Sequence, residues 1–161
     1  MATWQEFAAA APSLAERVHR RFASAETHIL ATLRRDGSPR VSGSEVDFRE
    51  GSVYLGSMLD AVKARDLRRD GRFALHAAPG DPAAGGDAKL AGVATEVTDP
   101  ASLAQAEAVA GGSHLFHLDV REAVMTWVEG NTLFAESWQP GRGLVRFARP
   151  DNGPVVRTEL D

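Results

Sequence analysis

The first residues of the chain show the spacing of a helix. Between residues 14 and 22 an apolar residue recurs at every fourth position, so these side chains share one face. Ser13 and Glu16 have the spacing of a capping box, and Pro12 stands just before them. The pattern predicts a helical N-terminal segment over residues 3–24, divided at Pro12 into a short first helix and a second one.

The pattern changes to that of β-strands after the helical segment. Residues 28–33 form a short apolar run, the Asp36-Gly37 pair is typical of a hairpin turn, and residues 40–48 alternate between apolar and polar. A second reversal leads into residues 52–57, which alternate in the same way. These runs predict a three-stranded antiparallel meander.

The remainder of the chain mixes helices with further strands. Residues 58–69 have helical spacing with Asp60 as a possible cap, and Asp99 and Pro100 mark the start of a helix over residues 100–110. Residues 79–87 are rich in glycine, proline and aspartate, as in a flexible loop. The other expected strands cover residues 73–78, 89–97, 114–120, 123–129 and 132–138.

These elements give about seven strands with helices placed singly between them. Such an order is typical of an antiparallel barrel, closed or partly open, and not of a doubly wound sheet. A length of 161 residues fits one domain. We therefore expect one mainly β domain over residues 1–161, with a barrel over 28–149, a few peripheral helices and a loosely held tail over 150–161.

The composition narrows the class of protein. Hydrophobic residues make up 43% and charged residues 25% of the chain, as in ordinary globular domains. The chain contains no cysteine, which excludes disulfides, thiolate metal sites and a cysteine nucleophile. A net charge of -4 argues against nucleic acid as a partner, and no stretch reads as a membrane span or a secretory leader. We expect a cytoplasmic protein that acts on a small molecule.

The sequence lacks the familiar catalytic and metal-binding motifs. It has neither a phosphate-binding glycine loop nor a nucleophile elbow. His114 and His117 are three residues apart on one expected strand, so they point to opposite faces and are not expected to share a metal ion.

Residues 56–75 carry the pattern that points most directly to a ligand. Ser57 ends an expected strand and Lys63 lies one turn into the expected helix, where backbone N–H groups favour an anion. A phosphate group could bind there, although Asp60 would repel it unless its carboxylate points away. A solvated helix face is the simpler interpretation of the nearby basic residues, which are Arg65, Arg68, Arg69 and Arg72.

Together with the hairpin that precedes it, this stretch resembles the pyridoxamine 5'-phosphate oxidase-like superfamily of FMN-binding split β-barrels. The likeness extends over residues 28–138 in the order of elements. It implies an antiparallel split β-barrel that works as a homodimer with two equivalent sites at the interface. It also implies a flavoprotein oxidoreductase, in which FMN supplies the redox chemistry and the protein orients it.

The resemblance further implies a set of cofactor-binding residues. The positions that hold the flavin phosphate and ring edge in the superfamily are occupied by Arg40, Ser57 and Lys63. Backbone amides at Val41 and Ser42 are plausible partners of the flavin ring. Trp127 matches a tryptophan that flanks the flavin from the partner subunit, with Trp138 as a second candidate; for either, packing in the barrel core is the alternative.

Departures from the superfamily's pattern argue against vitamin oxidation itself. Val62 and Glu45 stand where basic residues are expected, and residues 133–137 lack the arginine and histidine that grip the pyridoxine phosphate. The weaker phosphate site leaves room for the deazaflavin coenzyme F-420, so an F-420-dependent reductase is the first alternative. A flavin- or haem-binding protein without turnover and a structural barrel with an empty site are the others.

Overall fold

The computed structural model describes residues 2–99, 103 and 113–160. The helices are α1 (Trp4–Ala10), α2 (Pro12–Ala23), α3 (Val62–Arg69) and a short 3-10 helix, η1 (Pro82–Ala84). The strands are β1 (His28–Leu33), β2 (Pro39–Ser44), β3 (Val46–Arg49), β4 (Ser52–Met58), β5 (Arg72–His76), β6 (Asp87–Glu96), β7 (Ser113–Glu129), β8 (Thr132–Gln139), β9 (Gly143–Pro150) and β10 (Val156–Leu160). None of the helices described is both long and apolar enough to span a membrane.

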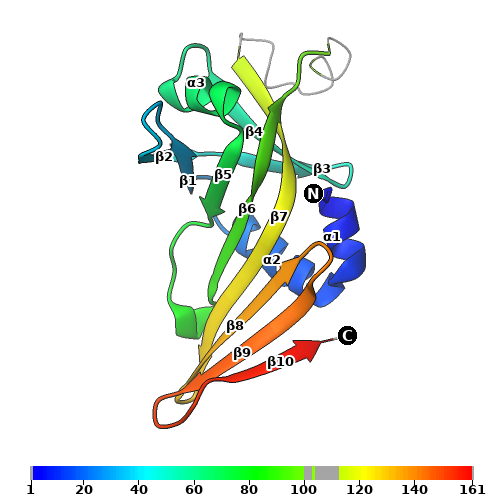
Figure 1. The fold of residues 1–161 in the computed structure, drawn as a ribbon, viewed down its shortest axis with the longest axis vertical. Coiled ribbons are helices and arrows are strands. Elements are labelled where there is room, and N and C mark those ends of the chain that lie inside the picture. The colour runs from blue at the N-terminus through cyan, green and yellow to red at the C-terminus, as the bar shows by residue number, and fades with distance from the viewer. Residues whose placement is uncertain (1, 100–102, 104–112, 161) are drawn as a thin grey trace.

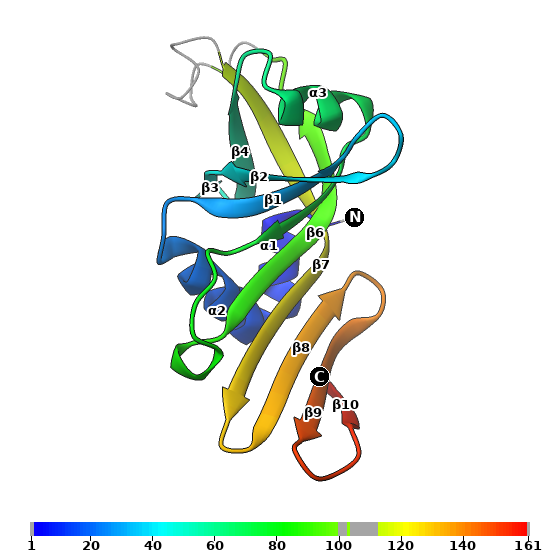
Figure 2. The same ribbon diagram turned by 90° about the vertical axis from the view of Figure 1, so that its left-hand side faces the viewer.

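The strands form one antiparallel sheet that curls into a partly open barrel at one end (Figure 1). The order along the sheet is β10-β9-β8-β7-β6-β5-β1-β2, and β4 pairs with both β3 and β7. The long strand β7 pairs with β4 over residues 113–117 and with β8 over residues 123–129. The meander β8–β9–β10 therefore leaves the barrel below β4 (Figure 2). This arrangement confirms the predicted split β-barrel with peripheral helices.

The N-terminal helices cover one side of the barrel. α2 packs on β6 and β7 and buries Leu14, Val18 and Phe22, as the helical spacing predicts. The break at Pro12 is confirmed, because α2 begins there. The capping box, however, belongs to α1: the Thr3 side chain accepts from the backbone N–H of Glu6, whose carboxylate accepts from the N–H of Thr3. The predicted box at residues 13 and 16 was wrong, since both residues lie inside α2.

Two boundaries near the barrel end differ from the prediction. Residues 40–48 are divided by Glu45 into β2 and β3 instead of forming one strand. The helix expected from residue 58 begins at Val62, because Asp60 has a φ of 58°, a left-handed conformation that a helical turn does not accept. Asp60 is therefore not the cap of α3, whose N-cap residue is Ala61.

The two strands predicted over residues 114–120 and 123–129 are one strand, β7. The sequence pattern breaks there because the pairing with β6 shifts register: Gly92 pairs with Val120 and Ala91 with Glu122, which leaves Arg121 as an extra residue. The extra residue forms a β-bulge, which reverses the alternation of buried and exposed side chains along β7 without ending the strand.

The C-terminal residues are strand-paired. β9 pairs with β8 along its length, and β10 pairs with β9 from Val156 to Leu160, so the prediction of a loosely held tail was wrong. The side chains of β10 are nearly all exposed, and the strand is held by its backbone ladder at the sheet edge. The helix predicted over residues 100–110 lies outside the described residues except for position 103.

Candidate functional site

A cleft of about 630 Å³, which we call the Lys63 cleft, lies where β2, β3, β4 and β7 meet the start of α3. Ser57 and Lys63, which the sequence analysis paired, both line it. Other lining residues include Ser44, Glu45, Gly56 and Leu115. The volume is in the range typical of sites for small molecules and cofactors.

Lys63 reaches across the cleft from α3 to β2. Its Nζ donates to the carbonyl oxygen of Gly43 at 2.7 Å and to the Ser44 Oγ at 2.8 Å. Burial lowers the pKa of Lys63, and the nearby carboxylate of Glu45 opposes this by raising it. The ammonium group is thus held at a fixed place on the cleft wall.

Ser57 carries an unsatisfied hydroxyl. Ser57 is only 5% exposed, and its Oγ has no hydrogen-bond partner among the described residues. A buried hydroxyl without a partner is destabilising by about 1 to 3 kcal/mol, so it calls for an explanation such as a bound group. Across the β4–β7 ladder Ser57 pairs with His114, whose Nδ1 lies 2.7 Å from the Glu96 carboxylate.

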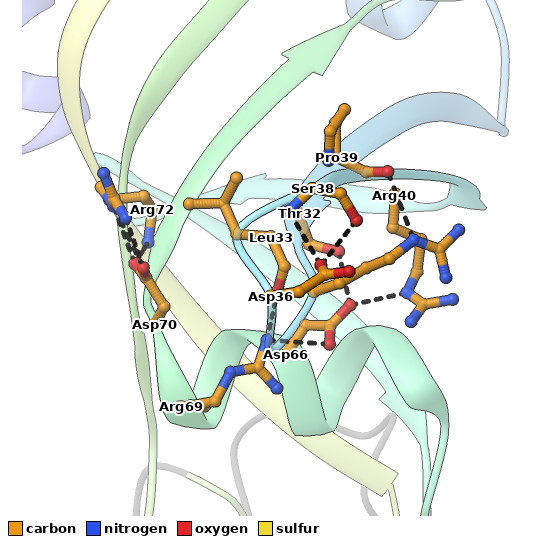
Figure 3. A network of polar contacts seen from close by, with 11 residues as sticks. Thr32, Leu33, Asp36, Ser38, Pro39, Arg40, Asp66, Arg69, Asp70 and Arg72 are labelled. Carbon is orange, nitrogen blue, oxygen red and sulfur yellow. Dashed lines mark hydrogen bonds and ion pairs between the residues drawn. The ribbon is translucent and has the colours of Figure 1, made fainter.

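Arg40 belongs to a network centred on Asp66 of α3 (Figure 3). Asp66 is 3% exposed; its carboxylate accepts from Arg40 Nε at 2.6 Å, from Thr32 Oγ1 at 3.0 Å and from Arg69 Nη2 at 3.1 Å. Burial raises the pKa of Asp66, but these three hydrogen bonds together outweigh it and hold the pKa below its usual value. Arg40 does not line the Lys63 cleft; the network instead fixes α3, and with it Lys63, on β1 and β2.

The basic side chains after Lys63 are mostly engaged in ion pairs. Arg68 pairs with Glu96 at 2.9 Å, Arg69 pairs with Asp66, and Arg72 pairs with Asp70 at 2.6 Å. Arg68 and Arg72 are largely exposed, in line with a solvated face.

Val41 and Ser42 lie on β2, next to the part of that strand that lines the cleft. β2 pairs only with β1 among the described strands, so alternate backbone N–H groups along it face away from the sheet. The Val41 side chain is 69% exposed. Neighbouring N–H groups on a strand point in opposite directions, so one of the two at Val41 and Ser42 faces away from β1.

The two tryptophans lie in different surroundings, away from the Lys63 cleft. Trp138 is 5% exposed and packs in the core with its ring centroid 4.8 Å from that of Phe7. Trp127 lines a second cleft of about 350 Å³ beside α2, and that cleft shares no lining residue with the first. Within one chain, Trp127 and Lys63 therefore face different clefts.

The lining of the Lys63 cleft carries two acidic and two basic side chains. Glu45 and Asp47 line it as well as Lys63 and Arg49. Arg49 Nε lies 3.4 Å from the Asp47 carboxylate, and its guanidinium stacks over Tyr54, so Lys63 is the cation best placed for an anion. Sequence reasoning missed the acidic side of the cleft, although Glu45 and Asp47 stand two residues apart in the strand predicted over residues 40–48, which would place them on one face.

No group of three or more metal-binding side chains occurs within residues 2–99, 103 and 113–160. His114 faces Glu96 and Phe116, whereas His117 contacts the Tyr54 ring on the other face of the sheet.

The family described as Pyridoxamine 5'-phosphate oxidase matches the chain over residues 14–147. Among solved structures, a haem-binding protein from Mycobacterium smegmatis is similar at a TM-score of 0.57 and 17% identity, over 90% of this chain and 91% of that one. A Clostridium acetobutylicum protein of the pyridoxinephosphate oxidase family, related to general stress protein 26, is similar at a TM-score of 0.57 and 10% identity. The match covers 92% of this chain and 94% of that one.

The haem storage protein HutZ of Vibrio cholerae has a TM-score of 0.52 and 18% identity, over 69% of this chain and 89% of that one. At such identities the likeness establishes the fold alone. No curated protein matches the chain.

Proposed function

Because this chain belongs to the pyridoxamine 5'-phosphate oxidase family, whose model matches residues 14–147, we propose that the Lys63 cleft binds a flavin and that the protein is a flavin-dependent oxidoreductase with FMN as cofactor. The observation that carries this proposal is the buried Ser57 Oγ, which lacks a partner in the same cleft that holds the Lys63 ammonium. A phosphate oxygen would accept from both groups.

The residues in and beside the cleft would bind different parts of the flavin. Lys63 and Ser57 donate to the phosphate, and the one N–H of the Val41–Ser42 pair that faces away from β1 donates to the edge of the flavin ring. Arg40 does not line the cleft; in this proposal its pair with Asp66 holds α3, and with it Lys63, in place. Bound FMN would supply hydride or electron transfer, which the protein supports by orienting and shielding it.

A second copy of the chain completes the proposed site. Several exposed apolar side chains lie on β1, β2, the end of β4 and the start of α3, and Met58 among them lines the Lys63 cleft. Ile29 is 37%, Val41 69%, Met58 78%, Leu59 58% and Val62 42% exposed. Exposed apolar side chains gathered around a site are typical of an interface. We propose that a homodimer covers them; Trp127, which the resemblance assigned to the flavin of the partner subunit, lines the other cleft and has no part in this proposal.

Sedimentation velocity tests the dimer. The wild-type protein is expected to sediment at twice the chain mass, and Val41→Glu with Met58→Glu, which places two charges in the proposed interface, is expected to sediment as a folded monomer. A wild-type monomer, or a double variant that stays dimeric, would contradict the proposed interface.

Lys63→Ala is expected to weaken FMN binding by about 1 to 3 kcal/mol, because a charge-assisted contact with the phosphate is lost. Quenching of flavin fluorescence on titration measures this. Lys89→Ala is the matched control, since Lys89 is exposed on β6, is the only other lysine of the chain and does not line the cleft. Equal affinities of wild type and Lys63→Ala would remove Lys63 from the site.

Gly56→Leu is expected to block the cleft without unfolding the protein. Gly56 lines the cleft, and a Cβ built at this residue meets nothing within 4 Å. A leucine side chain would therefore occupy the ligand's space, and FMN affinity should fall by at least about tenfold, or 1.4 kcal/mol. Thermal unfolding of the variant provides the check on folding. Full FMN affinity in a folded Gly56→Leu protein would place the flavin elsewhere.

Haem binding is the second candidate function. It is favoured by the haem-binding protein of Mycobacterium smegmatis and the haem storage protein of Vibrio cholerae, which share this fold. A Soret band that develops on titration with haem, together with no binding of flavin, would select this function.

A further inference from the structure

The second cleft, which we call the Trp127 cleft, has its own chemistry. It lies between α2, the η1 turn and the end of β7, and encloses about 350 Å³. The principal side chains that line it are Arg17, Arg20, Arg21, Met125 and Trp127. We propose that this cleft binds a small planar aromatic anion, namely a carboxylate or phosphate monoester carried on one or two aromatic rings. This goes beyond the proposed flavin site, with which the cleft shares no lining residue.

The cleft carries excess positive charge. None of its described lining residues is acidic. Glu136 pairs with Arg17 at 2.8 Å and Glu16 pairs with Arg20 at 2.5 Å, whereas Arg21 donates only to neutral oxygens, those of Ser24 and Ala78. Two carboxylates thus face three guanidinium groups, and Glu136 is shared with another arginine, at position 146 of β9.

Two of these arginines also keep a donor that the protein does not satisfy. Among the described residues, three buried side-chain polar atoms lack a hydrogen-bond partner: the Nε of Arg17, the Nε of Arg21 and the Ser57 Oγ. Each belongs to a residue that lines one of the two clefts. Since a buried unpaired donor is destabilising, an anion reached by a small rotation of either guanidinium would remove that penalty. Both arginines would therefore make the binding of an anion more favourable.

The rest of the cleft favours a flat apolar group. The guanidinium of Arg17 lies 4.3 Å from the centroid of the Trp127 ring, and the Phe134 ring stacks on the same indole at 5.2 Å. The indole is therefore held in place, and the thioether of Met125 lines the wall beside it. Guanidinium planes, indole edges and thioethers all contact aromatic rings favourably. The volume limits the ligand to one or two rings.

Isothermal titration calorimetry with phenyl phosphate and 1-naphthoate tests this proposal. Both are expected to bind with a Kd of roughly 0.1 to 1 mM. Inorganic phosphate and cyclohexanecarboxylate, which lack the flat ring, are expected to bind at least about tenfold more weakly. Arg20→Glu should weaken the binding of both aromatic anions by at least about tenfold, because it reverses a charge at the cleft.

Arg157→Glu is the matched control. Arg157 also stands in an exposed ion pair, with Glu159 on β10, but does not line the cleft, so its charge reversal should leave the affinities unchanged. The proposal is overturned if neither aromatic anion binds, if cyclohexanecarboxylate binds as well, or if both variants lose affinity equally. FMN affinity should be the same in Arg20→Glu and wild type; a loss would instead make this cleft part of the flavin site.

Discussion

Asp66→Ala is expected to lower the free energy of unfolding by about 3 to 5 kcal/mol. The Asp66 carboxylate is buried and accepts from Arg40, Arg69 and Thr32, which come from three different elements. Removing one partner of a buried ion pair leaves the other charge uncompensated, and such changes are among the most destabilising. Urea denaturation of wild type and variant measures the difference.

Asp70→Ala is the control for this prediction. Asp70 also pairs with an arginine, Arg72, whose hydrogen bond is the largest cause that lowers the pKa of Asp70 to about 2. This pair lies at the surface, where ion pairs contribute little, so the loss should be much smaller than for Asp66. Similar losses in the two variants would show that the network around Asp66 does not hold α3.

The same network predicts a pH dependence. Because the folded pKa of Asp66 is below its unfolded value, the stability it contributes is present above the unfolded pKa, near pH 3.9, and is lost as the pH falls through the folded pKa. The wild-type protein should therefore lose stability more steeply below about pH 4 than Asp66→Asn, which has no carboxylate to protonate. Parallel curves would contradict this assignment.

Gly92→Ala is expected to destabilise the barrel by about 3 kcal/mol or more, or to prevent folding. A Cβ at Gly92 would lie 1.8 Å from the backbone carbonyl oxygen of Asp119, and neither strand can move without breaking the β6–β7 ladder. Overpacking against backbone at a bulge is poorly relieved. Thermal unfolding, or soluble yield if the variant does not fold, measures the effect.

Gly56→Ala provides the comparison for Gly92→Ala. Gly56 also lies in a strand, but its Cβ would meet nothing within 4 Å, so the variant should be as stable as wild type or slightly more so. An equal loss at both glycines would show that strand glycines as such, and not the close approach at the bulge, determine the stability.

The sequence predicted local features of the site better than distant ones. Ser57 and Lys63 are six residues apart, across a strand end and the first turn of a helix, and the structure places both on one cleft. The partner of Arg40 could not be predicted, since Asp66 lies 26 residues away and meets it only when α3 docks on β1 and β2. The arginines of α2 stand close together in the sequence, but the cleft that they line also needs Trp127, which follows more than 100 residues later.

For the fold, too, some strands could be predicted from the sequence and others could not. β4 was predicted because its one buried face leaves an alternating pattern in the sequence, and β1 because it is a short apolar run before a hairpin turn. β10 was missed because its side chains are almost all exposed and only the backbone ladder with β9 defines it. The bulge opposite Gly92 made β7 look like two strands, because one extra residue reverses the alternation.

The central claim is that the Lys63 cleft holds the phosphate of a flavin. A paired titration of the purified protein with FMN and with coenzyme F-420, after the visible spectrum has been recorded as isolated, tests it most directly. We predict one FMN bound per chain, weaker binding of F-420, and a loss of FMN affinity in Lys63→Ala but not in Lys89→Ala. Selective binding of F-420 would replace FMN with the deazaflavin, and binding of neither would contradict the claim.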